Sequence, residues 1–192
     1  MLFITIAALL WGSIGPATQL LYELGQTTVL SITFIRLAIA VPVLAYFCWK
    51  QSGYCIGLMV PRDARLMIVI GFFIALNQLT YLAAIAFIGS TAATLIAICA
   101  APVFVTLIAV VFLRERLTGI VMLALVGALS GTALLIGFPV SQRGTNNAFL
   151  GIGFALLSAI GYAGIIISGR FFASRYHPLQ VTTIGFSVGA LL

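Results

Sequence analysis

Long apolar stretches alternate with short polar connections along the whole chain, and this pattern predicts helices that cross a membrane. The apolar stretches are Leu2 to Tyr22, Thr28 to Trp49, Leu66 to Ile88, Thr91 to Leu113, Gly119 to Phe138, Ala148 to Gly169 and Leu179 to Leu192. A helix rises about 1.5 Å per residue and the hydrocarbon core of a bilayer is about 30 Å thick, so about 20 residues are needed to cross it. The pattern therefore predicts an all-α, polytopic transmembrane helix bundle with about six complete spans and a partial seventh.

Composition supports the membrane class and excludes several others. Apolar residues make up 63% of the chain and charged residues 6%, against roughly 25% charged residues in a soluble domain. The net charge is +6, but the basic residues are scattered singly between apolar stretches, so we expect a lipid bilayer and not nucleic acid as the partner. The three cysteines lack the spacing of a metal or redox site, and we assign the chain no metal and no cofactor.

The basic residues predict the orientation of the chain. If the connections are numbered alternately, one side receives Lys50, Arg62, Arg65, Arg114, Arg116, Arg170 and Arg175, and the other receives Arg143. Cytoplasmic connections carry the excess of Lys and Arg in multispan proteins. We therefore expect a multi-pass protein of the cell (inner) membrane with a cytoplasmic N-terminus.

Small residues recur four positions apart in several predicted helices, which lets helices approach closely in lipid. The rows are Ala97/Ala101, Ala124/Ala128/Thr132, Gly127/Gly131, Ala155/Ala159/Ala163 and Gly185/Gly189. The last apolar stretch is too short to cross a bilayer, so we also expect the chain to be a piece of a longer protein.

Short motifs in several stretches give a resemblance to a known family. They are Leu10-Trp11-Gly12-Ser13, Phe34-Ile35-Arg36, Ala101-Pro102-Val103-Phe104, Leu113-Arg114-Glu115-Arg116-Leu117 and Arg175-Tyr176-His177-Pro178. In this order and spacing the chain resembles the EamA-like family of the drug/metabolite transporter superfamily. Arg114 is a departure, because that family usually has Gly before the Glu-Arg pair.

The resemblance implies ten helices arranged as two inverted five-helix repeats, with a substrate path between them. Residues 1–138 resemble the first repeat, and residues 148–192 resemble the start of the second, truncated after the sixth helix and part of the seventh. The implied function is secondary transport, the export of small metabolites or amino acids by alternating access. The alternative is a non-transporting membrane scaffold or an inactive transporter fragment, and pairing with a second copy would be one way to supply a missing repeat. A membrane enzyme is disfavoured because the predicted spans contain no Asp and no His.

Arg36 is the sharpest candidate for a functional residue because it lies inside the second predicted span. An ionised arginine there costs at least about 2.5–3.5 kcal/mol unless it meets water or a partner. One interpretation is that Arg36 faces a central cavity and binds a carboxylate or another anionic group of a small-molecule substrate. The other is that it snorkels towards Glu23 or binds carbonyls at a helix end.

Polar side chains on other spans could line the same cavity. The candidate substrate-binding residues besides Arg36 are Asn77, Tyr81, Trp11, Gln78, Thr18, Thr94 and Tyr162. The alternative for each is a hydrogen bond between helices, worth about 0.6 kcal/mol. Asn77 and Tyr81 share a helix face, which favours the cavity for these two. We also expect Pro16 to unwind the first helix locally and free carbonyls for ligand contact.

Overall fold

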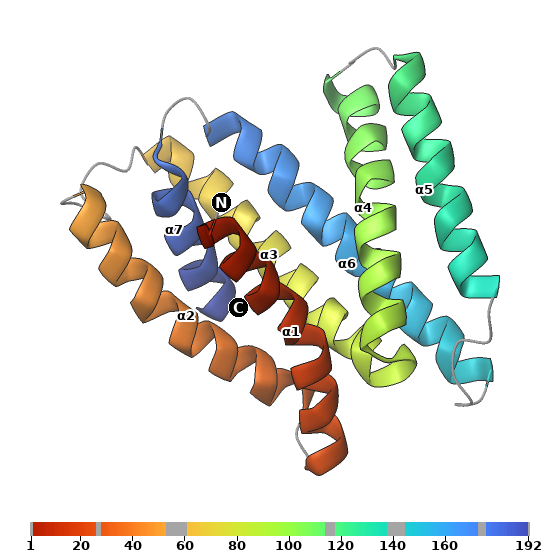
Figure 1. Ribbon diagram of the computed structural model, residues 1–192. Helices are drawn as coiled ribbons and strands as arrows, with labels where there is room; N and C mark the ends of the chain where they lie inside the picture. The colour runs from red at the N-terminus through yellow and green to blue at the C-terminus, as the bar shows by residue number, and fades with distance from the viewer. Residues whose placement is uncertain are drawn as a thin grey trace.

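The computed structural model describes residues 2–25, 28–52, 61–113, 118–137, 145–172 and 176–191, and every regular element in these ranges is an α-helix (Figure 1). The helices are α1 (Leu2–Leu24), α2 (Val29–Ser52), α3 (Pro61–Ile88), α4 (Ser90–Leu113), α5 (Gly119–Gly137), α6 (Thr145–Phe172) and α7 (Pro178–Leu191). The all-α helix bundle expected from the apolar pattern is confirmed.

Five of the described helices are long and apolar enough to cross a membrane, and they lie in α1, α2, α3, α4 and α6. The assessed apolar part of α5, Gly119–Gly131, and the whole of α7 are shorter than a span. Large apolar side chains such as Leu9, Ile39 and Leu123 are exposed on the outer faces of α1, α2 and α5. This distribution is typical of a protein whose outer surface contacts lipid.

Helix α3 is the centre of the bundle, and its most extensive neighbour is α6. Both helices cross the middle of the molecule in Figure 1. The row Ala155, Ala159 and Ala163 on α6 is fully buried, as its four-residue spacing predicts. Small side chains let the helix axes approach, and Gly161 and Gly164 of α6 lie directly against Asn77 and Phe73 of α3.

Helix α7 lies against α2 and α3 and packs through the predicted row Gly185/Gly189. Gly185 and Gly189 are buried, and a Cβ atom at Gly189 would lie 3.1 Å from the carbonyl oxygen of Gly71. The Gly127/Gly131 row is different, because neither glycine has a neighbour within 4 Å among the described residues. A side chain at either position would therefore meet no other described atom at its Cβ.

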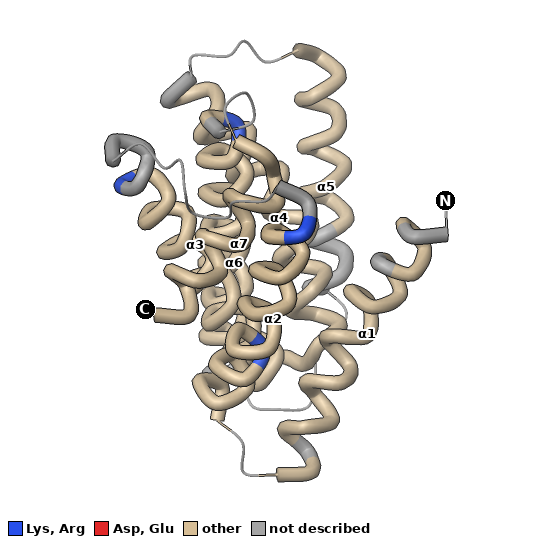
Figure 2. Tube along the Cα trace, turned by 90° about the vertical axis from the view of Figure 1, so that its left-hand side faces the viewer, with Lys and Arg blue, Asp and Glu red and all other residues tan. Residues whose placement is uncertain are grey.

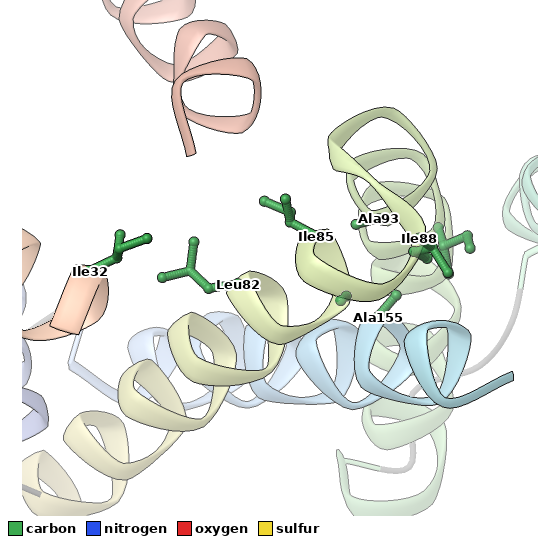
Figure 3. Packing of buried hydrophobic residues seen from close by; sticks show 8 residues of the cluster. Ile32, Leu82, Ile85, Ile88, Ala93 and Ala155 are labelled. Carbon is green, nitrogen blue, oxygen red and sulfur yellow. The ribbon is translucent and has the colours of Figure 1, made fainter. Parts of the chain in front are cut away.

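The main apolar cluster lies where α2, α3, α4 and α6 meet, at the turn between α3 and α4 (Figure 3). It contains Ile32, Leu82, Ile85, Ile88, Ala93 and Ala155, together with Ala84 and Ile96. A single residue, Gly89, separates α3 from α4. Its φ of 81° lies in the left-handed region that favours glycine, and its N–H donates to the carbonyl of Ile85 at 2.9 Å.

The prolines inside the helices do not interrupt them. Helices α1, α2 and α4 run without a break through Pro16, Pro42 and Pro102. The expectation that Pro16 unwinds α1 is therefore wrong. A proline removes one N–H donor from the helix, and residues on either side keep their own hydrogen bonds, so a membrane helix continues past it.

Candidate functional site

Arg36 lies on α2, about 10 Å along the helix from its first residue, Val29. The side chain is half-buried. Its terminal nitrogen Nη1 is buried and has no hydrogen-bond partner among the described residues. A buried cationic nitrogen without a partner is costly, so this atom is the most unusual polar group in the described part of the molecule.

Two tyrosines from different helices lie within electrostatic range of the guanidinium. Tyr22 on α1 and Tyr81 on α3 both interact electrostatically with Arg36. We call these three residues the Arg36 cluster. Three consecutive helices thus contribute one polar side chain each to one place in the bundle.

A chain of hydrogen bonds connects Tyr81 to α4 and then to α1. The hydroxyl of Thr94 donates to the carbonyl of Ser90 at 2.7 Å, so the 2.7 Å contact between the Tyr81 and Thr94 hydroxyls has Tyr81 as the donor. Ser90 donates from its backbone N–H and from its hydroxyl to Oε1 of Gln19, at 3.1 and 2.8 Å. The side chain of Gln19 therefore caps the N-terminus of α4.

A glycine on α1 makes this arrangement possible. A Cβ atom at Gly15 would lie 3.2 Å from Cβ of Ser90 and 3.7 Å from the hydroxyl oxygens of Thr94 and Tyr81. Because Gly15 has no side chain, α1 comes close enough for Gln19 to reach Ser90. The stripe of α1 that faces the cluster is therefore Gly15, Gln19 and Tyr22.

The structure places the two candidates on α1, Thr18 and Trp11, away from the Arg36 cluster. Thr18 is buried, and its hydroxyl donates to the carbonyl of Ile14 on its own helix at 2.8 Å. Trp11 is 66% exposed on the outer side of α1. Neither is brought into the Arg36 cluster.

Asn77 and Tyr81 share a face of α3 but bind different helices. The amide nitrogen of Asn77 donates to the carbonyl oxygen and to the hydroxyl of Ser158 on α6, at 2.9 and 3.0 Å. Asn77 is thus part of the α3–α6 contact, while Tyr81 binds Thr94 on α4. Tyr162 on α6 is 36% exposed, so the structure does not gather all the candidates in one place.

Gln78 on α3 lies at about the same level of the bundle as Arg36 on α2. Ile32 of α2 and Leu82 of α3 belong to the same apolar cluster, and α2 and α3 run in opposite directions (Figure 1). One turn after Ile32 is Arg36, and one turn before Leu82 is the half-buried Gln78. The two helices therefore place Gln78 at the level of Arg36.

The candidates predicted from the sequence do not include Tyr22, Gln19 and Ser90. Tyr22 donates a long hydrogen bond, 3.3 Å, to the carbonyl of Leu82. The available signal was the spacing of Gly15, Gln19 and Tyr22 along one side of α1, which can be read in the sequence.

The remaining described cations lie away from this cluster. Lys50 is in the last turn of α2 and Arg170 in the last turn of α6, and Arg65 is exposed near the start of α3. In Figure 2 the described basic positions are separate and form no patch. The side chain of Glu23, the suggested snorkelling partner of Arg36, lies outside the described residues.

Comparisons with known proteins agree on one family. Residues 1–137 match the EamA-like transporter family. The chain is also similar to the uncharacterized inner membrane transporter YicL of Salmonella typhimurium, at 31% identity over 197 residues. That match covers 100% of this chain and 64% of YicL, so the chain spans less than two thirds of this relative. No solved structure matches the chain.

Proposed function

Because the chain belongs to the EamA-like transporter family, we propose that it acts as a secondary transporter that exports small metabolites or amino acids by alternating access. The proposed site of action is the cell (inner) membrane, with the N-terminus in the cytoplasm. The relative YicL is described as an inner membrane transporter, which supports this location. The excess of basic residues on one side of the expected spans supports the orientation.

One observation supports a transport role for the described helices above all others. The terminal nitrogen Nη1 of Arg36 on α2 is buried and has no hydrogen-bond partner among the described residues. A purely structural arginine would be expected to have its nitrogens paired, because the cost of a cation in a membrane span is at least about 2.5–3.5 kcal/mol. Charged residues inside spans commonly mark substrate or ion pathways. We therefore place the substrate path beside Arg36.

The proposed path is lined by the Arg36 cluster and by the candidates nearest to it, Gln78 and Thr94. The hydrogen bonds that Ser90 donates to Gln19 and that Tyr81 donates to Thr94 hold α1, α3 and α4 around this place. Asn77, Tyr162, Thr18 and Trp11 stay predictions as substrate contacts, because no described contact joins them to the cluster.

Counterflow in vesicles tests the proposal. The purified chain is reconstituted, vesicles are loaded with a mixture of unlabelled amino acids and small metabolites, and uptake of labelled compounds is measured. We expect uptake with the wild-type chain and a loss of at least about tenfold with Arg36→Ala, because a charge-assisted contact is worth about 1.5–3 kcal/mol.

The matched control is Arg65→Ala, which removes an exposed cation near the start of α3. We expect it to keep wild-type uptake. Equal uptake in protein-free vesicles, wild type and Arg36→Ala would overturn transport by this chain and favour the scaffold alternative.

A further inference from the structure

The Arg36 cluster contains one cation and two hydroxyl donors on three different helices. The guanidinium has five N–H donors in a fixed plane that matches two oxygen atoms of one carboxylate. One of its terminal nitrogens, Nη1, is buried and unpaired in the described structure. The cluster therefore has unused donor capacity at a place that is largely removed from solvent.

The two tyrosines differ in the length of the hydrogen bond that each hydroxyl donates. Tyr81 donates at 2.7 Å to Thr94, whose own proton is committed to the Ser90 carbonyl. Tyr22 donates at 3.3 Å to the Leu82 carbonyl, which is long for a hydroxyl donor, since such bonds are usually about 2.7–2.8 Å. Tyr22 can exchange this weak bond for a charge-assisted bond to an anion at little cost, whereas Tyr81 cannot.

The charge of the Arg36 cluster indicates how much negative charge a ligand should carry. Lys50, the other described cation of α2, lies about 21 Å along the helix from Arg36. Asp63 lies on α3, about 27 Å along that helix from Tyr81. Arg36 therefore supplies the positive charge of the cluster, and a ligand with one negative charge would balance it.

We propose that Arg36 and Tyr22 bind the carboxylate of a small organic monoanion, with Tyr81 as a positioning residue held by Thr94. This inference rests on the proposed function only in placing the site on a substrate path. A doubly charged phosphate would leave excess charge in a membrane span, which is costly. An amino acid would bring an ammonium group for which the described cluster provides no acidic partner.

Equilibrium binding to the purified full chain in detergent tests the ligand class. The probes are acetate, butyrate, benzoate and indole-3-acetate, each compared with its neutral amide, and also phenylalanine and inorganic phosphate. We expect at least one carboxylate to bind at least about tenfold more tightly than its amide, and more tightly than phosphate or phenylalanine. The proposal is wrong if no carboxylate exceeds its amide, or if phosphate or phenylalanine binds most tightly.

Variants assign the roles of the side chains. We expect Arg36→Lys to weaken the preferred carboxylate by at least about tenfold, because a lysine is a point charge without the planar pair of donors. Tyr22→Phe is expected to weaken the carboxylate by about threefold to tenfold and leave amide binding unchanged. The matched control is Tyr46→Phe, which removes a hydroxyl from an exposed tyrosine of α2 and is expected to change neither.

A third variant tests whether Tyr81 acts on ligand binding or only on the stability of the chain. Tyr81→Phe is expected to lower the ratio of carboxylate to amide affinity, with the melting temperature of the unliganded chain recorded in parallel. If Arg36→Lys does not fold, Tyr22→Phe still decides the proposal, since its carboxylate-to-amide ratio either falls or stays at the wild-type value. An unchanged ratio in Tyr22→Phe would exclude Tyr22 from the site.

The outcomes separate this inference from transport. Carboxylate binding without counterflow would leave the anion site standing and overturn the transport proposal. Counterflow at equal rates for carboxylates and their amides would support transport and overturn the anion site.

Discussion

The contact between α3 and α6 and the Arg36 cluster both place polar groups between membrane helices, but they treat those groups differently. We call the first contact the α3–α6 seam, made by Asn77, Ser158, Gly161, Gly164 and Phe73. In the seam the amide nitrogen of Asn77 has two acceptors within 3.0 Å. In the Arg36 cluster one hydrogen bond is long and one cationic nitrogen has no partner.

The difference indicates two purposes for polar residues in this bundle. The seam is closely packed and its polar groups are paired, which is what stability requires. The cluster contains a hydrogen-bond donor without a partner, which lowers the stability of the folded chain and is typical of a functional site. Mutations should therefore separate the two regions by the sign of their effect on stability.

The largest expected effect is on the seam. A Cβ atom at Gly161 would lie 3.0–3.1 Å from the backbone N and Cα of Asn77, which cannot move aside as a side chain could. Gly161→Leu is expected to destabilise the chain by about 3 kcal/mol or more. The melting temperature in detergent should fall by about 2–4 °C for each kcal/mol.

The control for this variant lies on the same helix. Gly153 is exposed and has no neighbour within 4 Å, so Gly153→Leu is expected to leave the melting temperature within about 2 °C of wild type. Equal losses in the two variants would show that the seam is not where α3 and α6 hold each other.

The second prediction is an increase in stability and concerns the Arg36 cluster. Arg36→Leu removes the unpaired cation and adds apolar surface, and is expected to stabilise the unliganded chain by about 1–3 kcal/mol. The measurement is the same thermal unfolding, with Arg36→Lys as the control that keeps the charge. A loss of stability in Arg36→Leu would indicate a structural role for Arg36 and remove the contrast between the two regions.

The smallest expected effect is the loss of the hydrogen bond between Asn77 and Ser158 in the α3–α6 seam. A double-mutant cycle of Asn77→Ala and Ser158→Ala isolates the contact between the amide and the hydroxyl. We expect a coupling energy of about 0.6 kcal/mol and no more than about 1.7 kcal/mol, as for other hydrogen bonds between membrane helices. A coupling of zero would mean that Asn77 is held by the Ser158 carbonyl alone.

Much of the fold was predictable because apolar length alone identifies a membrane helix. The stretch from Leu2 to Tyr22 predicted α1 to within two residues. Helix α3 begins at Pro61, five residues before the predicted start at Leu66. Charged residues after Pro61 resemble a connection in a hydropathy pattern, although proline is favoured in the first turn of a helix.

Less of the candidate site was predictable, because spacing gives the face of a helix and not the neighbour that it meets. Asn77 and Tyr81 do lie on one side of α3, yet Asn77 reaches Ser158 and Tyr81 reaches Thr94. The same limit explains Trp11, whose spacing from Gly15 and Thr18 is helical but whose side chain lies on the exposed side of α1. Arg36 was predictable because its cost in a span does not depend on its neighbours.

Gly89 has a mechanical consequence. With one residue between α3 and α4, the connection contains no spare chain that could absorb a change in the angle between the two helices. A shift of the end of α3 therefore also moves the start of α4, where Ser90 donates to the side chain of Gln19 on α1.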